Sequence, residues 1–170
     1  MKLTLIRTAR ETGKETFSTW PSDTLMEKMK TENKAGHISA LRSLIPHITG
    51  SNGHYPCIDK PLPRICPAAE YARSKEGERY LKTYNGLVQI EVNHLANAVE
   101  VEQVKRQAAL LPQTFAAFCG SSGRSVKIWV LFATPDGSRP RQEEKIRLFH
   151  TAAYRLAVNC YQPCSPTPSH

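Results

Sequence analysis

The sequence lacks the features that mark membrane and secreted proteins. It has no apolar run of the roughly 18 residues that a membrane-spanning helix needs. The first ten residues, MKLTLIRTAR, contain neither the apolar core nor the cleavage site of a signal peptide. We therefore expect a soluble, cytoplasmic protein that has no membrane partner.

Paired cysteines and acidic residues are also scarce. The five cysteines form no CxxC pair, their number is odd, and no His/Cys cluster has zinc-site spacing, which argues against a disulfide framework and a zinc finger. Asp and Glu number 15 against 23 Lys and Arg, so the formal net charge is +8 at pH 7. This excess of positive charge makes nucleic acid or another anion the first ligand to consider.

The first 67 residues contain short elements and many turn formers. Residues 2–9 alternate in polarity as a strand does, whereas residues 21–30 and 36–48 have apolar residues at helical spacing. Glycine and proline are concentrated in residues 50–67, which predicts an irregular connection.

The second half of the chain has a clearer pattern. Val88, Ile90 and Val92 alternate with polar side chains, which is typical of a strand with one buried face. We predict a strand at 87–95, a helix at 97–112, a hairpin of strands at 114–120 and 125–133, and a long helix at 139–161 that buries Ile146, Phe149, Ala153, Leu156 and Ala157.

The order strand, helix, strand, strand, helix after Gly86 predicts the fold class. It is typical of an α+β protein with an open, mostly antiparallel sheet that helices cover on one face, in an RRM-like or primase-like arrangement. The last residues are rich in proline and serine, which predicts disorder. We predict a single domain at 1–162, with an N-terminal part at 1–66, a core at 67–162 that contains the βαββα unit at 85–162, and a disordered tail at 163–170.

Glu91 and Asn93 form the first candidate site. Residues two apart on a strand point to the same side, so both polar side chains would lie opposite the apolar face. Two oxygen-bearing side chains at the end of an apolar strand are the kind of ligands that a divalent metal ion uses. The alternative is a solvent-facing side of the strand, which Gln89 on the same side supports.

The turn GSSGRS, with the strand after it, is the second candidate. Backbone N–H groups in a serine-glycine turn can surround a phosphate, and the neighbouring cations can neutralise it. The Walker pattern is absent, because no GKS or GKT occurs. The alternative is a hairpin turn with solvated cations, and we expect Trp129 on this strand to be a packing residue. The candidate phosphate-binding residues are Ser122, Gly123, Arg124, Ser125 and Lys127.

Two motifs carry a resemblance to a known family. QIEVN in one apolar strand and SGRSVKIWV in a later one resemble the catalytic core of the archaeo-eukaryotic primase superfamily. More closely, the chain resembles the VirE-type N-terminal domain of mobile-element proteins, through LPRICPAAEY, YNGLVQIEVNHL, SGRSVKIWVLF and FHTAAYRLAVNCYQP. The likeness covers residues 60–163. It implies a mobile-element or replication-associated protein whose partner is DNA rather than RNA, or a nucleotide, beside a helicase-like region or protein.

The chain departs from the primase motifs where those motifs would hold metal. The resemblance places two carboxylates where this chain has Glu91 and Asn93, a histidine where it has Lys127, and a glycine where it has Ser125. A third carboxylate-bearing strand would fall beyond Tyr161. Nucleotide transfer with two Mg²⁺ or Mn²⁺ ions needs more carboxylates than Glu91 alone provides.

Three interpretations stay open. The first is a catalytically degenerate primase-like domain that binds nucleic acid or nucleotide phosphates. The second is a truncated nucleotidyltransferase core that needs downstream residues for metal-dependent primer synthesis. The third is a protein-interaction module with no nucleic-acid role, which would have no affinity for oligonucleotides.

Overall fold

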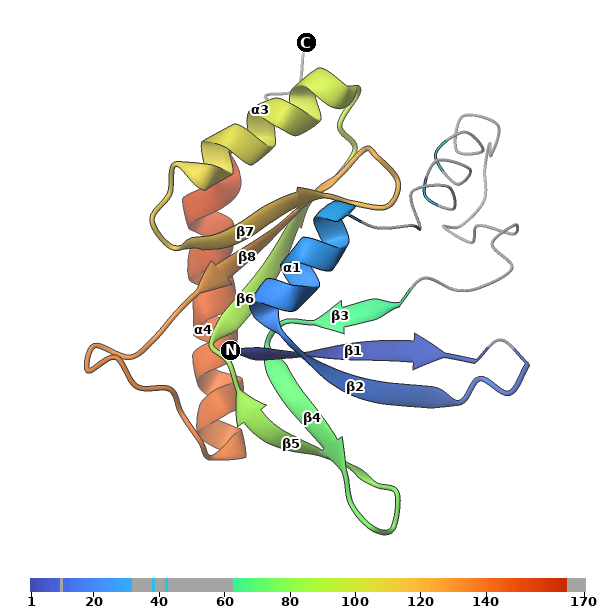
Figure 1. The fold of residues 1–170 in the computed structure, drawn as a ribbon. Helices are drawn as coiled ribbons and strands as arrows, with labels where there is room; N and C mark the ends of the chain where they lie inside the picture. The colour runs from blue at the N-terminus through green and yellow to red at the C-terminus, as the bar shows by residue number, and fades with distance from the viewer. Residues whose placement is uncertain (10, 32–37, 39–41, 43–62, 165–170) are drawn as a thin grey trace.

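The computed structural model describes residues 1–9, 11–31, 38, 42 and 63–164. Within these ranges the protein has three α-helices and three sheets, whose strand orders are β2-β1-β3, β4-β5 and β6-β8-β7 (Figure 1). All pairings are antiparallel. The strands are β1 (Lys2–Thr8), β2 (Glu15–Pro21), β3 (Arg64–Cys66), β4 (Ala69–Arg73), β5 (Arg79–Tyr84), β6 (Leu87–Val92), β7 (Thr114–Cys119) and β8 (Val126–Leu131). The helices are α1 (Ser22–Thr31), α3 (Ala98–Ala109) and α4 (Glu143–Tyr161), and a 3₁₀ turn, η2 (Gln162–Cys164), follows α4.

The central sheet, β6-β8-β7, and the two helices behind it confirm the predicted βαββα order and the open α+β fold. Both helices pack on the same face of this sheet. Asn97 caps the start of α3, and its side chain accepts hydrogen bonds from the N–H groups of Val99 and Glu100 at 2.9 and 3.0 Å. The buried residues of this core include Val88, Ile90, Val126, Ile128 and Val130 from the sheet, Val101, Val104 and Ala108 from α3, and Ala153, Ala157 and Tyr161 from α4.

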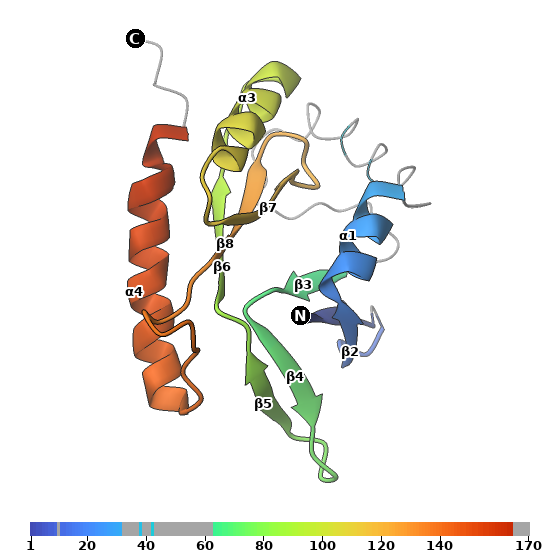
Figure 2. The ribbon, with the colours of Figure 1, turned by 60° about the vertical axis from the view of Figure 1, so that its left-hand side comes forward.

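The other face of the central sheet is also covered, which the sequence did not predict. Trp129 in β8 points to this face and is fully buried, in an apolar cluster with Leu3 of β1 and Leu25 of α1. Its indole N–H donates to Gln89 Oε1 over 2.9 Å. Figure 2 shows the resulting layers, with α4 on one side of the central sheet and α1 with the N-terminal strands on the other. Trp129 is a packing residue, as predicted.

Two buried polar side chains tie the N-terminal strands to the rest of the chain. Thr4 Oγ1 donates to the Ala69 carbonyl at 2.9 Å and accepts from the Tyr71 N–H at 2.8 Å. Asn85 Nδ2 donates to the Lys2 carbonyl at 2.8 Å. Because a buried polar group without a partner is costly, these bonds hold β1 in place against β4 and the start of β6.

Three sequence predictions are wrong in detail. Residues 64–66, which lie in the predicted irregular connection, form β3 and pair with β1. A pairing with so distant a segment leaves no local signal in the sequence. Leu156 is 54% exposed, because α4 turns its small Ala157 and its Tyr161 toward the sheet instead. Cys164, which lies in the predicted disordered tail, is buried in the core just after the end of α4.

Parts of the chain lie outside the described residues. They include most of the predicted helix at 36–48, most of the connection at 50–67, and tail residues 165–170. The four cysteines in the described ranges are free thiols, as expected. None of the helices in these ranges has the length and apolar character to cross a bilayer.

Candidate nucleic-acid interface

The turn between β7 and β8 is held together by its own backbone. The Gly120 N–H donates to the Ser125 carbonyl at 2.8 Å, and the Gly123 N–H donates to the Gly120 carbonyl at 3.0 Å. Gly123 has a φ of 74°, a left-handed conformation that glycine adopts without steric cost. Gly120 is favoured for another reason, since a Cβ at this position would overlap the Ser125 hydroxyl oxygen. GSSGRS therefore forms the tight end of a hairpin, as predicted.

Glu91, Ser125 and Lys127 come together beside this turn. The pairing of β6 with β8 places Glu91 directly opposite Lys127. Ser125 Oγ donates to Glu91 Oε1 at 2.8 Å, and Lys127 Nζ lies 3.8 Å from Glu91 Oε2. Ser125 is 4% exposed, whereas the side chains of Glu91 and Lys127 are 32% and 34% exposed. Glu91 from the predicted metal site and Ser125 and Lys127 from the predicted phosphate site therefore lie together in a single site.

This arrangement does not fit a two-metal site. One carboxylate oxygen of Glu91 accepts the Ser125 hydroxyl, and the other faces a cation. β6 ends at Val92, so the alternation that predicted a shared side for Glu91 and Asn93 stops before Asn93. Across the described ranges, no three His, Cys, Asp or Glu residues gather as a metal site requires. Glu91 is the partner of Lys127 here, and no step through Mg²⁺ or Mn²⁺ follows from these residues.

The two arginines at the turn have different partners. Arg124 Nε donates to the Leu95 carbonyl at 3.1 Å, which directs this guanidinium to the loop after β6. Arg42, for which the sequence predicted no role, donates to the carbonyls of Gly120 and Ser121 at 3.2 and 3.3 Å. The turn therefore receives a guanidinium from a distant part of the chain, while the Arg124 side chain bonds to the loop after β6.

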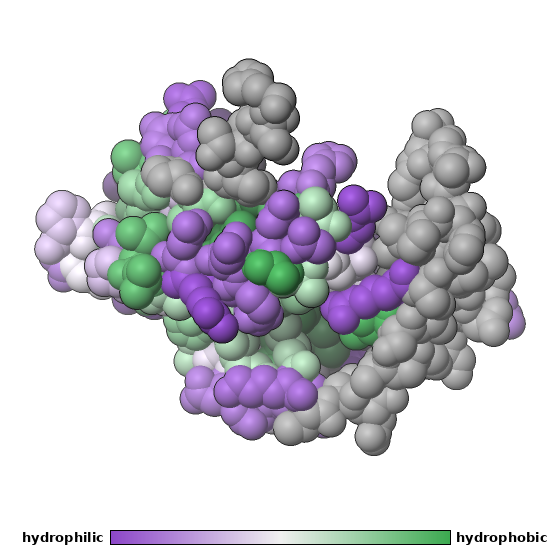
Figure 3. All heavy atoms as spheres, turned by 90° about the horizontal axis from the view of Figure 1, so that it is seen from above, coloured by the Kyte–Doolittle hydropathy of each residue, from purple (hydrophilic) through white to green (hydrophobic). Residues whose placement is uncertain are grey.

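A cleft of about 930 Å³ lies between α1, the N-terminal strands and the β7–β8 turn. Figure 3 looks down on this end of the molecule and shows hydrophilic side chains around a recess in which hydrophobic residues are visible. The apolar lining includes Trp20, Met26 and Met29. No Asp or Glu of the described residues lines the cleft, but seven basic residues do, and these are Arg7, Lys28, Lys30, Arg42, Arg64, Lys105 and Lys127.

Nearby carboxylates neutralise only part of this charge. In the described part of the chain, Arg7, Lys28 and Arg42 pair with no carboxylate. Lys28 Nζ instead lies 5.1 Å from the centroid of the Trp20 ring. The other four cations form partly or largely exposed ion pairs, which are weak and can give way to a stronger anion. These pairs are Lys30–Glu27 at 3.1 Å, Lys105–Glu102 at 2.7 Å, Lys127–Glu91 at 3.8 Å, and Arg64–Glu15.

The cleft can attract phosphate groups and hold an apolar or aromatic group beside them. Of its residues, Lys127 is the one phosphate contact that the sequence predicts. Trp20, Lys28 and Arg42 could not be predicted, because they come from separate segments that share no motif. The only sequence signal for this group was the net charge of +8.

Comparison with protein families shows which family the chain belongs to. The model of the BT4734-like N-terminal domain matches residues 58–169, about two thirds of the sequence. The chain belongs to this family. The part that matches the BT4734-like N-terminal domain runs from β3 to η2 and includes the central sheet, α3, α4 and the β7–β8 turn. The cleft wall formed by β1, β2 and α1 lies outside the match. No curated protein and no solved structure matches the chain.

Proposed function

We propose that this BT4734-like N-terminal domain binds nucleic acid through backbone phosphates, in the cleft between α1 and the β7–β8 turn. The observation that carries the proposal is that seven cations line one cleft with no described carboxylate among them. Neutralisation of phosphates by Lys and Arg supplies nearly all sequence-independent affinity for nucleic acid. The Met and aromatic lining suits the sugar and base surfaces that accompany the phosphates.

The proposed role is binding rather than catalysis. Glu91 offers one carboxylate, already engaged by Ser125 and Lys127, where a two-metal transfer needs several. This is the first of the three interpretations above, a degenerate primase-like domain. From the resemblance to VirE-type domains we also propose DNA as the partner and a mobile-element or replication-associated protein as the setting.

The test is fluorescence anisotropy with a labelled single-stranded DNA of about 12 nucleotides. The variant Lys28→Ala/Lys127→Ala removes two cleft cations. The control, Lys145→Ala/Arg147→Ala, removes two exposed cations from α4, on the far side of the central sheet (Figure 2). Both variants have the same net charge. We expect the cleft variant to bind about tenfold more weakly, a loss of about 1.4 kcal/mol, and the α4 variant to bind like the intact chain.

Equal weakening in both variants would mean that affinity follows net charge and not the cleft, which contradicts the proposal. Absence of binding by the intact chain would also contradict it and would favour the protein-interaction interpretation. Circular dichroism spectra of the intact chain and both variants would show whether loss of folding causes any change.

A further inference from the structure

Trp20 is one of the partly buried aromatic side chains among the described residues that line the cleft. Of the other two, Trp129 is fully buried, and the partly buried Phe118 ring packs edge-to-face on it with centroids 5.0 Å apart. Trp20, near the end of β2, is half-buried and lines the cleft. Its Nε1–H donates to Ser18 Oγ at 3.2 Å on the same strand. This bond satisfies the polar edge of the indole, while the ring packs in part on the apolar cluster around Trp129 and has Lys28 Nζ over its face.

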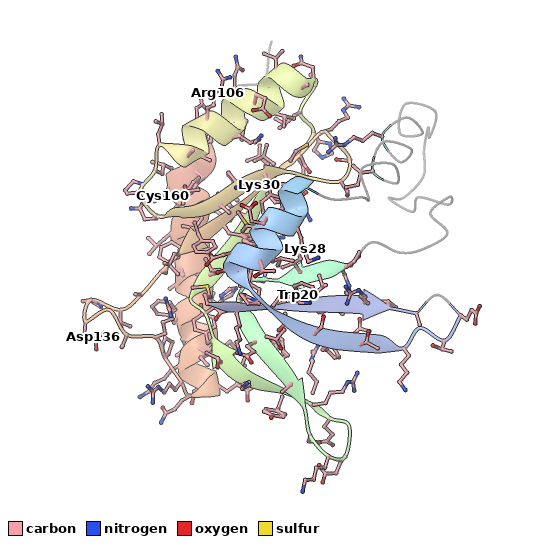
Figure 4. The ribbon with its side chains drawn as sticks, in the orientation of Figure 1. Trp20, Lys28, Lys30, Arg106, Asp136 and Cys160 are labelled. Carbon is pink, nitrogen blue, oxygen red and sulfur yellow. The ribbon has the colours of Figure 1, made fainter. Side chains whose placement is uncertain are left out.

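The surroundings of Trp20 combine apolar surface with positive charge. Met26 and Met29 of α1 and Ile65 of β3 line the same cleft. Methionine adapts its shape and makes favourable contacts with aromatic rings. Lys28 Nζ lies over the Trp20 ring, 5.1 Å from its centroid, and Figure 4 labels both residues. A base that stacks on this face would displace the ammonium to the edge of the ring, where it would meet the phosphate of the same nucleotide.

We infer that Trp20 is a base-stacking platform, so that the cleft selects single-stranded over double-stranded nucleic acid. The inference rests on the proposed function and adds the kind of nucleic acid that the cleft takes. Every base has a π-face, and stacking of a base on an aromatic side chain strengthens binding whatever the base. In a duplex, neighbouring base pairs cover these faces. A duplex would therefore offer phosphates to Lys28 but nothing to Trp20.

The experiment compares two single-stranded probes of equal length and charge, an oligothymidylate and an abasic oligomer, by fluorescence anisotropy with the intact chain. We expect the oligothymidylate to bind about tenfold more tightly. Trp20→Ala should abolish this preference, whereas Trp20→Phe should retain most of it. The matched control is Tyr80→Ala, which removes a 48% exposed ring outside the cleft and should behave like the intact chain.

Intrinsic fluorescence gives a second readout. The chain has two tryptophans, and Trp129 is fully buried, so a change on adding oligothymidylate reports on Trp20 and should vanish in Trp20→Phe. Unlabelled duplex should displace the oligothymidylate less well than unlabelled oligothymidylate does.

The outcomes separate this inference from the proposed function. If the oligothymidylate and the abasic probe bind equally, or if the duplex competes equally well, the inference is overturned while the proposed function stands. If neither probe binds, both fail. If Trp20→Ala does not fold, the two probes on the intact chain and on Trp20→Phe still decide the question.

Discussion

Gly120→Ala tests how the β7–β8 turn is packed beside the cleft. The backbone of Gly120 is not in the left-handed region, so the obstacle to a side chain is space. An added Cβ would overlap Ser125 Oγ, while Ser125 Cβ and Glu91 Oε1 lie at 3.4 and 3.5 Å, which is near or within ordinary contact. Ser125 must therefore turn its hydroxyl away, and this breaks the 2.8 Å hydrogen bond to Glu91.

The magnitude follows from that bond. A hydrogen bond to a charged group contributes about 1.5–3 kcal/mol, and Ser125 is only 4% exposed, so water replaces it poorly. Alanine recovers about 0.4–1 kcal/mol by restricting the unfolded chain. We expect the free energy of unfolding to fall by about 1–2 kcal/mol. For a chain of this length, each kcal/mol lowers Tm by about 2–4 °C.

The assay is urea unfolding, followed by circular dichroism, of the intact chain, Gly120→Ala, Ser125→Ala and the double variant. In the Ser125→Ala background the overlapping oxygen is gone, so Gly120→Ala should cost nothing or stabilise slightly. The two substitutions should therefore couple by about 1.5–3 kcal/mol, the contribution of the lost hydrogen bond, because the gain from restricting the unfolded chain is the same in both backgrounds. An equal cost of Gly120→Ala in both backgrounds, or no cost in the intact chain, would refute the packing argument.

Two further predictions concern the helices. Asn97→Ala removes the acceptor of the Val99 and Glu100 N–H groups, so the free energy of unfolding should fall by about 1 kcal/mol. Thermal unfolding tests this, and an unchanged Tm would contradict a stabilising role of Asn97 at the start of α3. Burial lowers the pKa of His150 below its ordinary value of 6.5, and in its neutral form its Nδ1 can accept the Tyr84 hydroxyl at 3.0 Å. This contribution to stability is complete above the unfolded pKa and is lost as pH falls toward the lowered folded pKa. In urea unfolding, the free energy of unfolding should therefore decrease less between about pH 7 and pH 5 for His150→Gln than for the intact chain. An equal decrease would contradict the stabilising role of neutral His150.

The central βαββα core was predictable because its signals are local. Val88 and Ile90 alternate with polar residues within one strand, and Val101 and Val104 recur at helical spacing within one helix. The β7–β8 hairpin is marked by glycine and serine at its turn. Each pattern reflects which side of a single element is buried, and a single stretch of sequence contains that information.

The layer on the other face of the central sheet could not be predicted in this way. β2, with sequence ETFSTWP, has mostly polar or partly exposed residues and therefore no clear apolar alternation. β3 is three residues long and exists through its pairing with β1. Such pairings join distant segments and leave no periodic trace in either one.

The candidate site was predictable only in part. Ser125 and Lys127 stood out because they follow a glycine-serine turn, and both lie next to Glu91. Nearness in sequence also assigned Arg124 to the same phosphate, but its side chain bonds to the loop after β6. Trp20 comes from a strand that no pattern identified, so its place in the cleft was visible only in the folded chain.

The salt dependence of binding tests the central claim, that the cleft cations neutralise phosphates, most directly. For a single strand, the logarithm of the binding constant falls against the logarithm of the salt concentration with a slope of about 0.7 per neutralised phosphate. Measured between about 50 and 200 mM salt, the slope for Lys28→Ala/Lys127→Ala should be shallower than that of the intact chain by about 1.4. Lys145→Ala/Arg147→Ala should leave the slope unchanged. Equal slopes for the cleft variant and the intact chain would contradict the claim.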